Sequence, residues 1–420
     1  MRLLQIRVPR KGQTVTVDTA GNQQLVKDIN RMALVRQLFA NPGLSRADLA
    51  TAIRLTKSTV SLIVRELLEE GWLGEREVLI TGDVGRRPTP LFIDPGRLIL
   101  LGAEVDIESA RVVATSLTGE VLATVVANYG ASKTAKSCIG SLATAMLKVH
   151  AQLDSSRQRI IGMGVGLPGG VDEASGFLRF APNLGWRDVP VGAMLRQKLA
   201  GTALAEAPLF VQNEADVAAL GEMEFNPSIA SDPLLYLSMN QGVGAGVIFN
   251  DRLFTGSRGF AGEVGHIVLQ INGPVCSCGR RGCAEALIGS RSILGAANEH
   301  PHPLGEILRL VESKDPETLR AVKKAGGYLG VLLQNLTAAY DPGCIVIGGR
   351  MADLGDVFLQ PALRTLNEYA LAANLTPPNV RTSRFGRDAV AVGAAALARY
   401  RLTRPLGGPV SAEVPLEKAA

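Results

Sequence analysis

Three closely spaced cysteines constrain this chain more than any other feature of its sequence. Together with the nearest preceding histidine, the cluster is His266, Cys276, Cys278 and Cys283. Three thiolates and one imidazole make a closed tetrahedral site of the kind that holds zinc as a structural ion. Gly279 and Gly282 allow the short loop to turn so that the sulfurs converge. The pattern predicts a structural Zn²⁺ ion in a knuckle over residues 276–283; the alternative is three incidental buried cysteines.

Cysteine usage also bears on the compartment. The chain has five cysteines, and a reducing cytosol leaves such thiolates free to bind metal, whereas a secreted domain would pair them. No window of about eighteen uninterrupted apolar residues is present, and the first residues lack the apolar run of a signal peptide. We therefore expect a cytoplasmic protein with no membrane partner.

Length and charge divide the chain into unlike parts. At 420 residues it exceeds one ordinary hydrophobic core, so two or more domains are expected. Residues 1–95 contain 14 Lys or Arg and 10 Asp or Glu, whereas the rest of the chain contains 30 and 29. This basic excess in the N-terminal quarter favours an anionic partner, such as nucleic acid, for the first domain.

The N-terminal region predicts a flexible arm followed by short helices. Residues 1–25 show no lasting hydrophobic period and are expected to be a mobile arm. An apolar stripe over residues 34–39 predicts a helix that stops at 41–43. Ser45 is expected to cap a second short helix that ends near Leu55.

A third helix is predicted between Thr56 as its N-cap and Gly71 as its terminating residue. Five apolar residues between Val60 and Leu68 form one inward stripe at helical spacing. The opposite face carries short polar or basic groups that fit a major groove about 12 Å wide. The candidate DNA-contacting residues of this helix are Lys57, Ser58, Ser61 and Arg65.

The segment after the third helix predicts a wing. Two short strands are expected at 78–80 and 90–93, around a Gly-Arg-Arg-Pro loop that contains Arg86 and Arg87. These two guanidinium groups are candidates for insertion into an A·T-rich minor groove. Residues 26–95 are therefore predicted to form a winged helix-turn-helix that binds double-stranded DNA; the alternative is a module that contacts protein only.

From Leu98 onward, apolar strands alternate with glycine-rich turns and helical stretches. This order predicts an α/β domain of two lobes with ligands in the crevice between them. Asn213 and Glu214 follow an apolar strand at the start of a helix. A carboxylate accepts hydrogen bonds from two hydroxyls and an amide both donates and accepts, so the pair suits a polyol. The alternative for Asn213 is a helix cap and nothing more.

Two further features flank this candidate site. Residues 241–246 form a glycine-rich turn of the kind that holds phosphates, although one such turn is too weak a signal to indicate an enzyme. Glu263 and Glu285 are tethered to the predicted zinc knuckle. If one nitrogen of His266 binds zinc, its other nitrogen is available to a ligand hydroxyl.

Taken together, these motifs resemble the ROK family of sugar kinases and repressors. The matching segments are residues 164–172, 182–186, 213–214, 242–246, 263–266, 276–285 and 341–349. The resemblance covers about residues 98 to 400. It implies a hexokinase-like and actin-like (ribonuclease H-like) fold, a homodimer or homotetramer, and structural zinc. The sugar-binding residues that it implies are Asn183, Asn213, Glu214, Glu263, His266 and Glu285.

Two departures separate the chain from kinases of that family. The kinases have an Asp-x-Gly-Gly-Thr turn at the ATP phosphates, whereas residues 104–108 read Glu-Val-Asp-Ile-Glu, and added acids repel phosphate. The kinases also have Asn-Asp where this chain has Asn213-Glu214, and the extra methylene moves the carboxylate by about an ångström. We therefore predict sugar binding without useful phosphoryl transfer.

The winged helix-turn-helix makes the chain similar to the repressor branch of the family, which includes xylose-operon and N-acetylglucosamine-type regulators. The predicted organisation is an arm (1–25), a winged helix-turn-helix (26–95), a sugar-binding domain (96–402) and a flexible tail (403–420). The predicted function is a sugar-responsive repressor of carbohydrate-utilisation genes, with xylose or a glucose-like sugar as effector and operator DNA as partner. The alternatives are a ROK-type ATP-dependent sugar kinase with an accessory DNA-binding domain, and a zinc-dependent scaffold.

Overall fold

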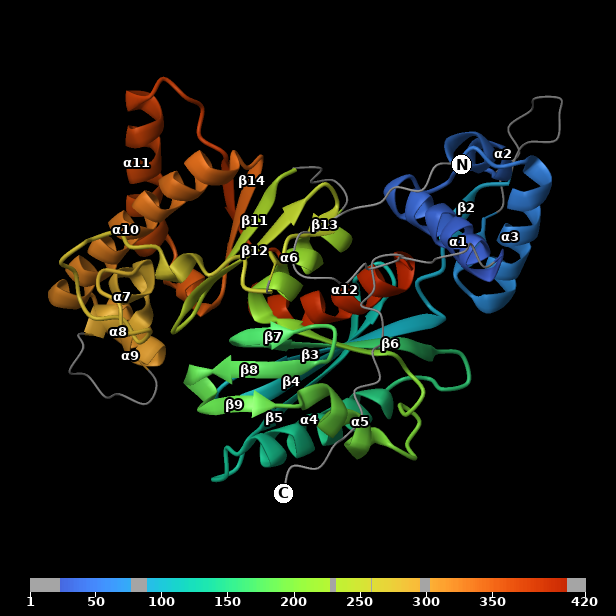
Figure 1. Ribbon diagram of the computed structural model, residues 1–420, viewed down its shortest axis with the longest axis horizontal. Coiled ribbons are helices and arrows are strands. Elements are labelled where there is room, and N and C mark those ends of the chain that lie inside the picture. Colours follow the sequence, from blue (N-terminus) through green and yellow to red (C-terminus); the bar gives the residue numbers. More distant parts are fainter. Residues whose placement is uncertain (1–22, 77–88, 227–231, 258, 295–302, 406–420) are drawn as a thin grey trace, which may run out of the picture.

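The computed structural model describes residues 23–76, 89–226, 232–257, 259–294 and 303–405. Figure 1 shows a small N-terminal unit beside a larger domain of two lobes. Among the described residues, no helix is both long and apolar enough to cross a membrane.

The N-terminal unit has three helices, α1 (Gln23–Ala40), α2 (Arg46–Ala52) and α3 (Lys57–Glu70). The predicted caps are present: Ser45 and Asp48 form a reciprocal capping box, the Thr56 hydroxyl accepts from the Thr59 amide, and Gly71 is left-handed at φ 86°. α1 begins at Gln23, inside the stretch assigned to the arm, and α2 ends before Leu55. Local capping chemistry thus sets the helix boundaries as the sequence indicates.

The wing starts earlier than predicted. β1 (Leu73–Glu75) pairs antiparallel with β2 (Leu91–Ile93), so the first strand forms directly after Trp72. Leu73 and Ile93 are buried against the helices, and this packing holds the strand close to the end of α3. Residues 78–80 and the candidates Arg86 and Arg87 lie outside the described residues.

The first lobe contains a five-stranded sheet in the order β10-β6-β3-β4-β5. Its strands are β3 (Leu98–Val105), β4 (Ser109–Ser116), β5 (Val121–Asn128), β6 (Arg159–Leu167) and β10 (Leu209–Asn213). Helices α4 (Ala135–His150) and α5 (Val191–Leu199) pack on one face of this sheet. A small sheet of β7 (Gly170–Asp172), β8 (Phe177–Ala181) and β9 (Trp186–Val189) lies beside the crevice.

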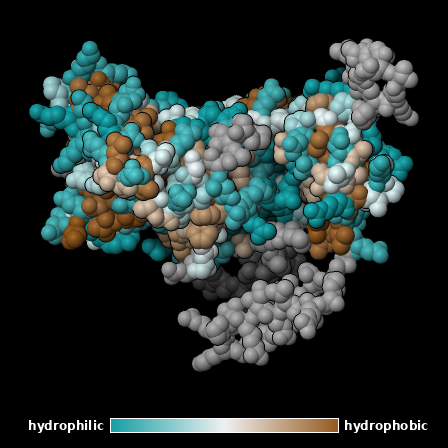
Figure 2. Space-filling view, turned by 90° about the horizontal axis from the view of Figure 1, so that it is seen from above, coloured by the Kyte–Doolittle hydropathy of each residue, from teal (hydrophilic) through white to brown (hydrophobic). Residues whose placement is uncertain are grey.

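The second lobe repeats this plan with the order β13-β12-β11-β14-β15. Its strands are β11 (Leu234–Met239), β12 (Val243–Phe249), β13 (Arg252–Leu253), β14 (Cys344–Gly348) and β15 (Asn379–Thr382). Its helices are α7 (Ala284–Ile288), α8 (Ser290–Leu294), α9 (Pro303–Glu312), α10 (Pro316–Tyr340) and α11 (Asp356–Ala372). The face seen in Figure 2 is largely hydrophilic, with apolar groups gathered over the end formed by these helices.

Helices α6 (Glu214–Glu224) and α12 (Ala389–Thr403) lie between the two sheets (Figure 1). Two glycines of the first sheet allow α12 to approach closely: a Cβ would lie 1.9 Å from the Ala391 oxygen at Gly102 and 1.8 Å from the Ala394 oxygen at Gly164. α12 also contacts α1 of the N-terminal unit. The predicted α/β domain of two lobes behind a winged helix-turn-helix is confirmed.

Candidate functional site

A crevice opens between the two lobes, and both lobes contribute polar groups to it. All six residues implied by the family resemblance line it: Asn183, Asn213, Glu214, Glu263, His266 and Glu285. They come from four separate segments, namely the 3₁₀ turn after β8, the β10–α6 junction, the 3₁₀ turn at Val264–His266 with the preceding Glu263, and the start of α7 after the knuckle. Residues far apart in sequence therefore converge on one polar pocket.

Asn213 is both a helix cap and a pocket residue. Its side-chain oxygen accepts from the Ala215 amide at 2.8 Å and from the Asp216 amide at 3.4 Å. Its side-chain nitrogen donates to the Gly169 oxygen at 2.9 Å. Asn213 therefore caps α6 and also lines the pocket, where its second amide hydrogen remains for a ligand.

Glu214 is the carboxylate at the centre of the crevice. Its Oε1 lies 3.5 Å from the Ser238 hydroxyl. Withdrawal from water and the charge of Asp106 raise the pKa of Glu214 to about 7, although hydrogen bonds from Ser238 and Asn240 oppose this rise. Near neutral pH the group therefore exists in both protonation states, and each state can bind a hydroxyl.

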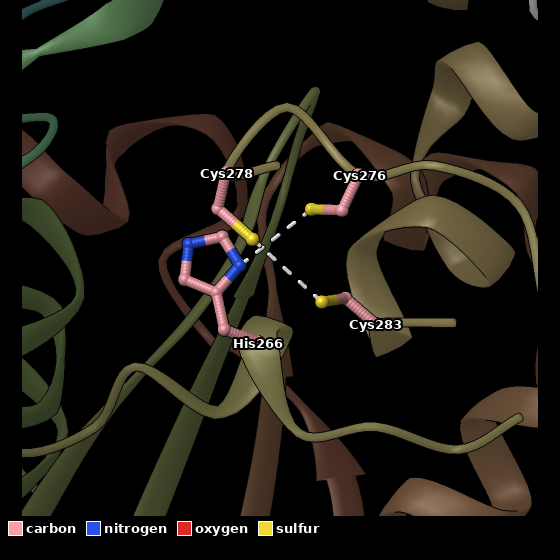
Figure 3. A group of neighbouring side chains, drawn as sticks. All are labelled: His266, Cys276, Cys278 and Cys283. Carbon is pink, nitrogen blue, oxygen red and sulfur yellow. Dashed lines mark hydrogen bonds between the residues drawn. The ribbon is translucent and has the colours of Figure 1, made fainter. Parts of the chain in front are cut away.

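The cysteine cluster forms as predicted. One ligand atom from each of His266, Cys276, Cys278 and Cys283 lies within 4.8 Å of the others. Figure 3 shows the imidazole and the three sulfurs pointing toward one centre. The Cys276 sulfur is 3.7 Å from His266 Nδ1, and the Cys278 and Cys283 sulfurs are also 3.7 Å apart. Such separations suit ligands placed at tetrahedral corners about 2.0–2.3 Å from a zinc ion.

The backbone turns of the knuckle bring its sulfurs together, and a neighbouring arginine favours the thiolate of Cys278. Gly279 and Gly282 have φ values of 84° and 69°, the left-handed turns that the loop was expected to need. Burial opposes ionisation of the Cys278 thiol, but hydrogen bonds from Arg280, whose Nε donates to the sulfur at 3.3 Å, lower its pKa to about 6. The donor set therefore fits a structural zinc ion.

Two contacts connect the cysteine cluster to the crevice, one through His266 and one through Ser277. His266 directs Nδ1 at the cysteines, whereas Nε2 lies 3.9 Å from Glu263 Oε2 in the pocket. Glu285 accepts from the Ser277 hydroxyl at 2.9 Å and from the Val243 amide at 3.3 Å. A metal that fixes the knuckle therefore also fixes the pocket carboxylates.

Several pocket residues were missed by the sequence analysis. They are Phe180, Asp216, Gln241 and Arg350. Asp216 is 3 % exposed, and burial together with the charges of Glu173 and Glu263 raises its pKa. Its place two residues after Glu214 on α6 was the available signal. Trp186, in the same matching segment as Asn183, packs in the core of the first lobe, where its indole N–H donates to the Lys133 oxygen at 3.2 Å.

A second cavity adjoins the first and shares Asp106, Glu108, Asn240 and Arg350 with it. The acids of the 104–108 turn line this cavity as well. Burial and the neighbouring Asp106 and Glu214 charges raise the pKa of Glu104 to about 8. The turn thus brings carboxyl groups, and no glycine cradle, to the boundary between the cavities.

The predicted DNA-contacting side chains of α3 are all exposed on one face of the N-terminal unit. They are Lys57, Ser58, Ser61 and Arg65. The inward stripe of the helix is buried, with Val60 and Val64 fully covered. An exposed polar face at the N-terminal half of the third helix is the arrangement by which such units enter the major groove.

Comparisons with known proteins agree with both parts of the chain. Residues 102–401 match the model of the ROK family, and residues 27–73 match a winged helix-turn-helix DNA-binding model. A putative xylose repressor of Caldicellulosiruptor sp. (strain Rt8B.4) is 28% identical over 393 residues, which cover 90% of this chain and 97% of that protein.

Two further similar proteins are a transcriptional regulator and a sugar kinase. The crystal structure of a ROK family transcriptional regulator, homologous to the E. coli MLC protein, superposes with a TM-score of 0.74 at 23% identity, covering 91% of this chain and 98% of that chain. A glucokinase of Halalkalibacterium halodurans is 31% identical over 256 residues, 57% of this chain and 76% of that protein. By fold, by sequence and by its preceding winged helix-turn-helix, the chain belongs to the ROK family.

Proposed function

We propose that the chain is a sugar-responsive transcriptional repressor that binds operator DNA through α3 and the wing and binds its effector between the lobes. One observation carries this proposal: the same chain has two candidate sites. One is the exposed polar face of α3, and the other is the pocket between the lobes, which is lined by Asn, Glu and His side chains. The full-length similarity to a putative xylose repressor favours xylose or a glucose-like sugar as effector.

The six pocket residues divide into roles by their geometry. Glu214 and Glu263 are the proposed acceptors for sugar hydroxyls, because the carboxyl oxygens of both line the crevice. Asn183, from the exposed turn after β8, offers an amide from the first lobe. Glu285 and His266 connect the ligand to the knuckle. Contacts from both lobes favour a closed crevice when sugar is bound.

We also infer a structural zinc ion held by His266, Cys276, Cys278 and Cys283. When bound, such an ion supplies a rigid tetrahedral cross-link between the knuckle loop and the turn that carries His266. The ion would not contact the sugar, which the side chains of the pocket would bind. The assembly is proposed to be a homodimer or homotetramer acting in the cytoplasm, because operators read by winged units are commonly two-fold sites.

Electrophoretic mobility shift with fragments of the chain's own promoter region tests the proposal. Specific binding in low salt that is released by one sugar of a hexose and pentose panel is the expected result. An Arg65→Ala variant should lose most of the binding, whereas Arg157→Ala, which removes an arginine 85% exposed on the other domain, should not. Failure to bind any promoter fragment contradicts the proposal.

A second candidate function, a ROK-type sugar kinase with an accessory DNA-binding unit, is favoured by the glucokinase similarity and by the retained pocket. The carboxylates of Asp106 and Glu108 argue against it, since both line the two adjoining cavities and would repel the phosphates of a nucleotide bound there. A coupled assay with ATP and Mg²⁺ decides between the two. Turnover near about 1–100 per second would establish the kinase.

A further inference from the structure

One large apolar side chain lies on the outer face of α3. Leu62 is 45 % exposed, whereas Val60, Ile63, Val64 and Leu67 of the same helix are at most 3 % exposed. A single exposed leucine is ordinary on a protein surface. Leu62 is of interest because it lies on α3, the helix that presents the proposed DNA-contacting residues.

Helix geometry places Leu62 at one edge of that face. A residue follows every 100° or so around an α-helix, so Leu62 lies about 40° from Ser58, one turn before, and about 60° from Arg65, one turn after. The two serines are already engaged locally: Ser61 Oγ donates to the Lys57 oxygen at 2.8 Å, and Ser58 Oγ lies 3.0 Å from Thr56 Oγ1. With both serines engaged, Lys57, Leu62 and Arg65 are the long side chains of this face.

The charges around α3 orient the helix toward DNA by its first half. Lys57 at the start of the helix and Arg65 just past its middle are both exposed, and both precede the acidic residues Glu66, Glu69 and Glu70. Further along, Glu66 is neutralised by Lys27 at 2.8 Å and Arg31 at 2.7 Å. The basic end is therefore complementary to the phosphates that flank a major groove, and it carries Leu62 with it.

We propose that Leu62 reads thymine in the operator by packing on its C5-methyl group. Thymine is the base that presents a methyl group in the major groove, and an aliphatic side chain is its natural partner there. The inference rests on the proposed DNA-binding function. The contact of Leu62 would give the DNA-binding face of α3 a preference for base sequence, in addition to the contacts of its basic residues with phosphates.

Substitution of thymine by uracil removes that methyl group alone. Sites selected from a random duplex library would be resynthesised with one deoxyuridine in place of each thymidine in turn. The wild-type chain should lose about threefold to tenfold in affinity at one or two positions per half-site. Leu62→Ala should bind the thymine and uracil versions of those positions equally, while the control Leu371→Ala, which truncates a leucine 77 % exposed on α11, should behave as wild type.

Each outcome of this experiment decides something different. A wild-type chain that is indifferent to uracil at every position contradicts the methyl contact. A uracil effect that persists unchanged in Leu62→Ala assigns the contact to another side chain and contradicts the role of Leu62. A selection that enriches no sequence contradicts the DNA-binding function itself, and is recognisable because it fails before any uracil is introduced.

A separate observation concerns the junction between the two units. Arg399 of α12 is 4 % exposed, and its guanidinium lies 4.0 Å from the ring centre of Phe39 at the end of α1. The same group donates to Glu224 at 2.7 Å and to the Leu117 oxygen at 2.9 Å. One buried arginine thus binds the DNA-reading unit to the first lobe and to the end of α6.

A hydrogen-bonded chain leads from this part of α12 to the crevice. Arg401 pairs with Glu173. Glu173 accepts from Gln212 Nε2 at 3.1 Å, and Gln212 Oε1 accepts from the backbone amide of Asn213 at 2.8 Å. Asn213 is a lining residue of the pocket. The last turns of α12 therefore contact the sugar site on one side and α1 on the other.

The structure assigns to the Arg399–Phe39 contact the transmission of sugar binding to the DNA-reading unit. Lobe closure moves the β10–α6 junction, and α12 carries that movement to α1. This inference too rests on the proposed function. A ligand can act in this way only through its different affinity for the two arrangements of the units.

The coupling factor, the ratio of operator dissociation constants with and without saturating sugar, measures this transmission. We expect a factor of about 5–150 in the wild-type chain and a value near 1 in Phe39→Leu, which keeps an apolar core side chain but removes the ring. Gln212→Leu, at the other end of the chain of contacts, should also lower the factor. Sugar affinity and sugar-free operator affinity should stay within about threefold of wild type. An undiminished factor in Phe39→Leu would overturn the assignment.

Discussion

Phe180 of the first lobe and Phe260 of the second stack across the mouth of the crevice, with ring centres 5.8 Å apart and planes inclined by 28°. Phe180 also lines the pocket. The pair is a direct apolar contact between the lobes beside the proposed sugar site, and it is present because Gly170 leaves room: a Cβ there would lie 2.6 Å from the Phe260 ring.

Loss of this stacking should weaken sugar binding. Phe260→Ala removes an aromatic pair worth about 0.5–1.5 kcal/mol, so we expect the effector dissociation constant to rise about twofold to tenfold in calorimetry. Phe254→Ala is the matched control, since Phe254 is similarly exposed but packs edge-on against Phe249. Equal effects of the two substitutions would show that the interlobe stack has no special part in closure.

Sugar affinity should depend on pH through Glu214. Its pKa of about 7 means that the acceptor form becomes more populated as the pH rises from 6 to 8. Affinity should increase by up to about tenfold over that interval if the carboxylate is the binding form. Glu214→Gln should bind more weakly and lose this dependence. A wild-type profile parallel to that of Glu214→Gln would remove Glu214 from the hydrogen-bonding set.

The stability of the sugar-free protein should change in the opposite direction. Glu104 and Glu214 have folded-state pKa values raised to about 8 and about 7, above their unfolded value of 4.5, so the folded state holds more protons between those limits. The free energy of unfolding should therefore fall as the pH rises from 4.5 to 8. Thermal melts of Glu104→Gln should lose part of this slope, and an unchanged slope would contradict the raised pKa.

Removal of one thiolate should release the metal. Cys278→Ser leaves three ligands, so we expect zinc content measured by mass spectrometry to fall well below one ion per chain and the sugar response to weaken. Cys138→Ala, which removes a cysteine of α4 outside the cluster, should retain the ion. Full zinc content in Cys278→Ser would refute the ligand assignment.

The wing should contribute to the salt dependence of DNA binding. Neutralising Arg86 and Arg87 together should lower the slope of log affinity against log salt by up to about 2, because each phosphate contact contributes about 0.9. Neutralising Arg157 and Arg187, exposed residues of the other domain, serves as the control. A slope equal to that of the control would remove the wing from the interface.

Features set by local chemistry were accessible from the sequence. The Ser45 and Thr56 caps and the Gly71 terminus depend on residues within one helical turn, so their pattern predicts the helices directly. The metal cluster was also predictable, because Cys276, Cys278 and Cys283 lie in one loop and few other arrangements satisfy them. These signals need no knowledge of the tertiary fold.

Features set by long-range packing were not accessible. The first strand of the wing begins at Leu73, before the expected residue 78, because Leu73 is buried under the helices and pairs there with Ile93. Phe180 and Phe260 meet across two lobes, and Arg399 reaches Phe39 from the opposite end of the chain. No periodicity or spacing connects such pairs, and only the complete fold brings them together.

The place of α12 between the two sheets has a consequence for biosynthesis. Ala389–Thr403 is the last helix of the described chain, and it fills the space above Gly102 and Gly164 in a sheet that is translated much earlier. The winged unit can thus emerge from the ribosome and fold while the sugar-sensing domain still lacks its central layer. A chain released before α12 would retain its DNA-reading surface without the means to be switched off, and premature termination should produce a repressor that no sugar relieves.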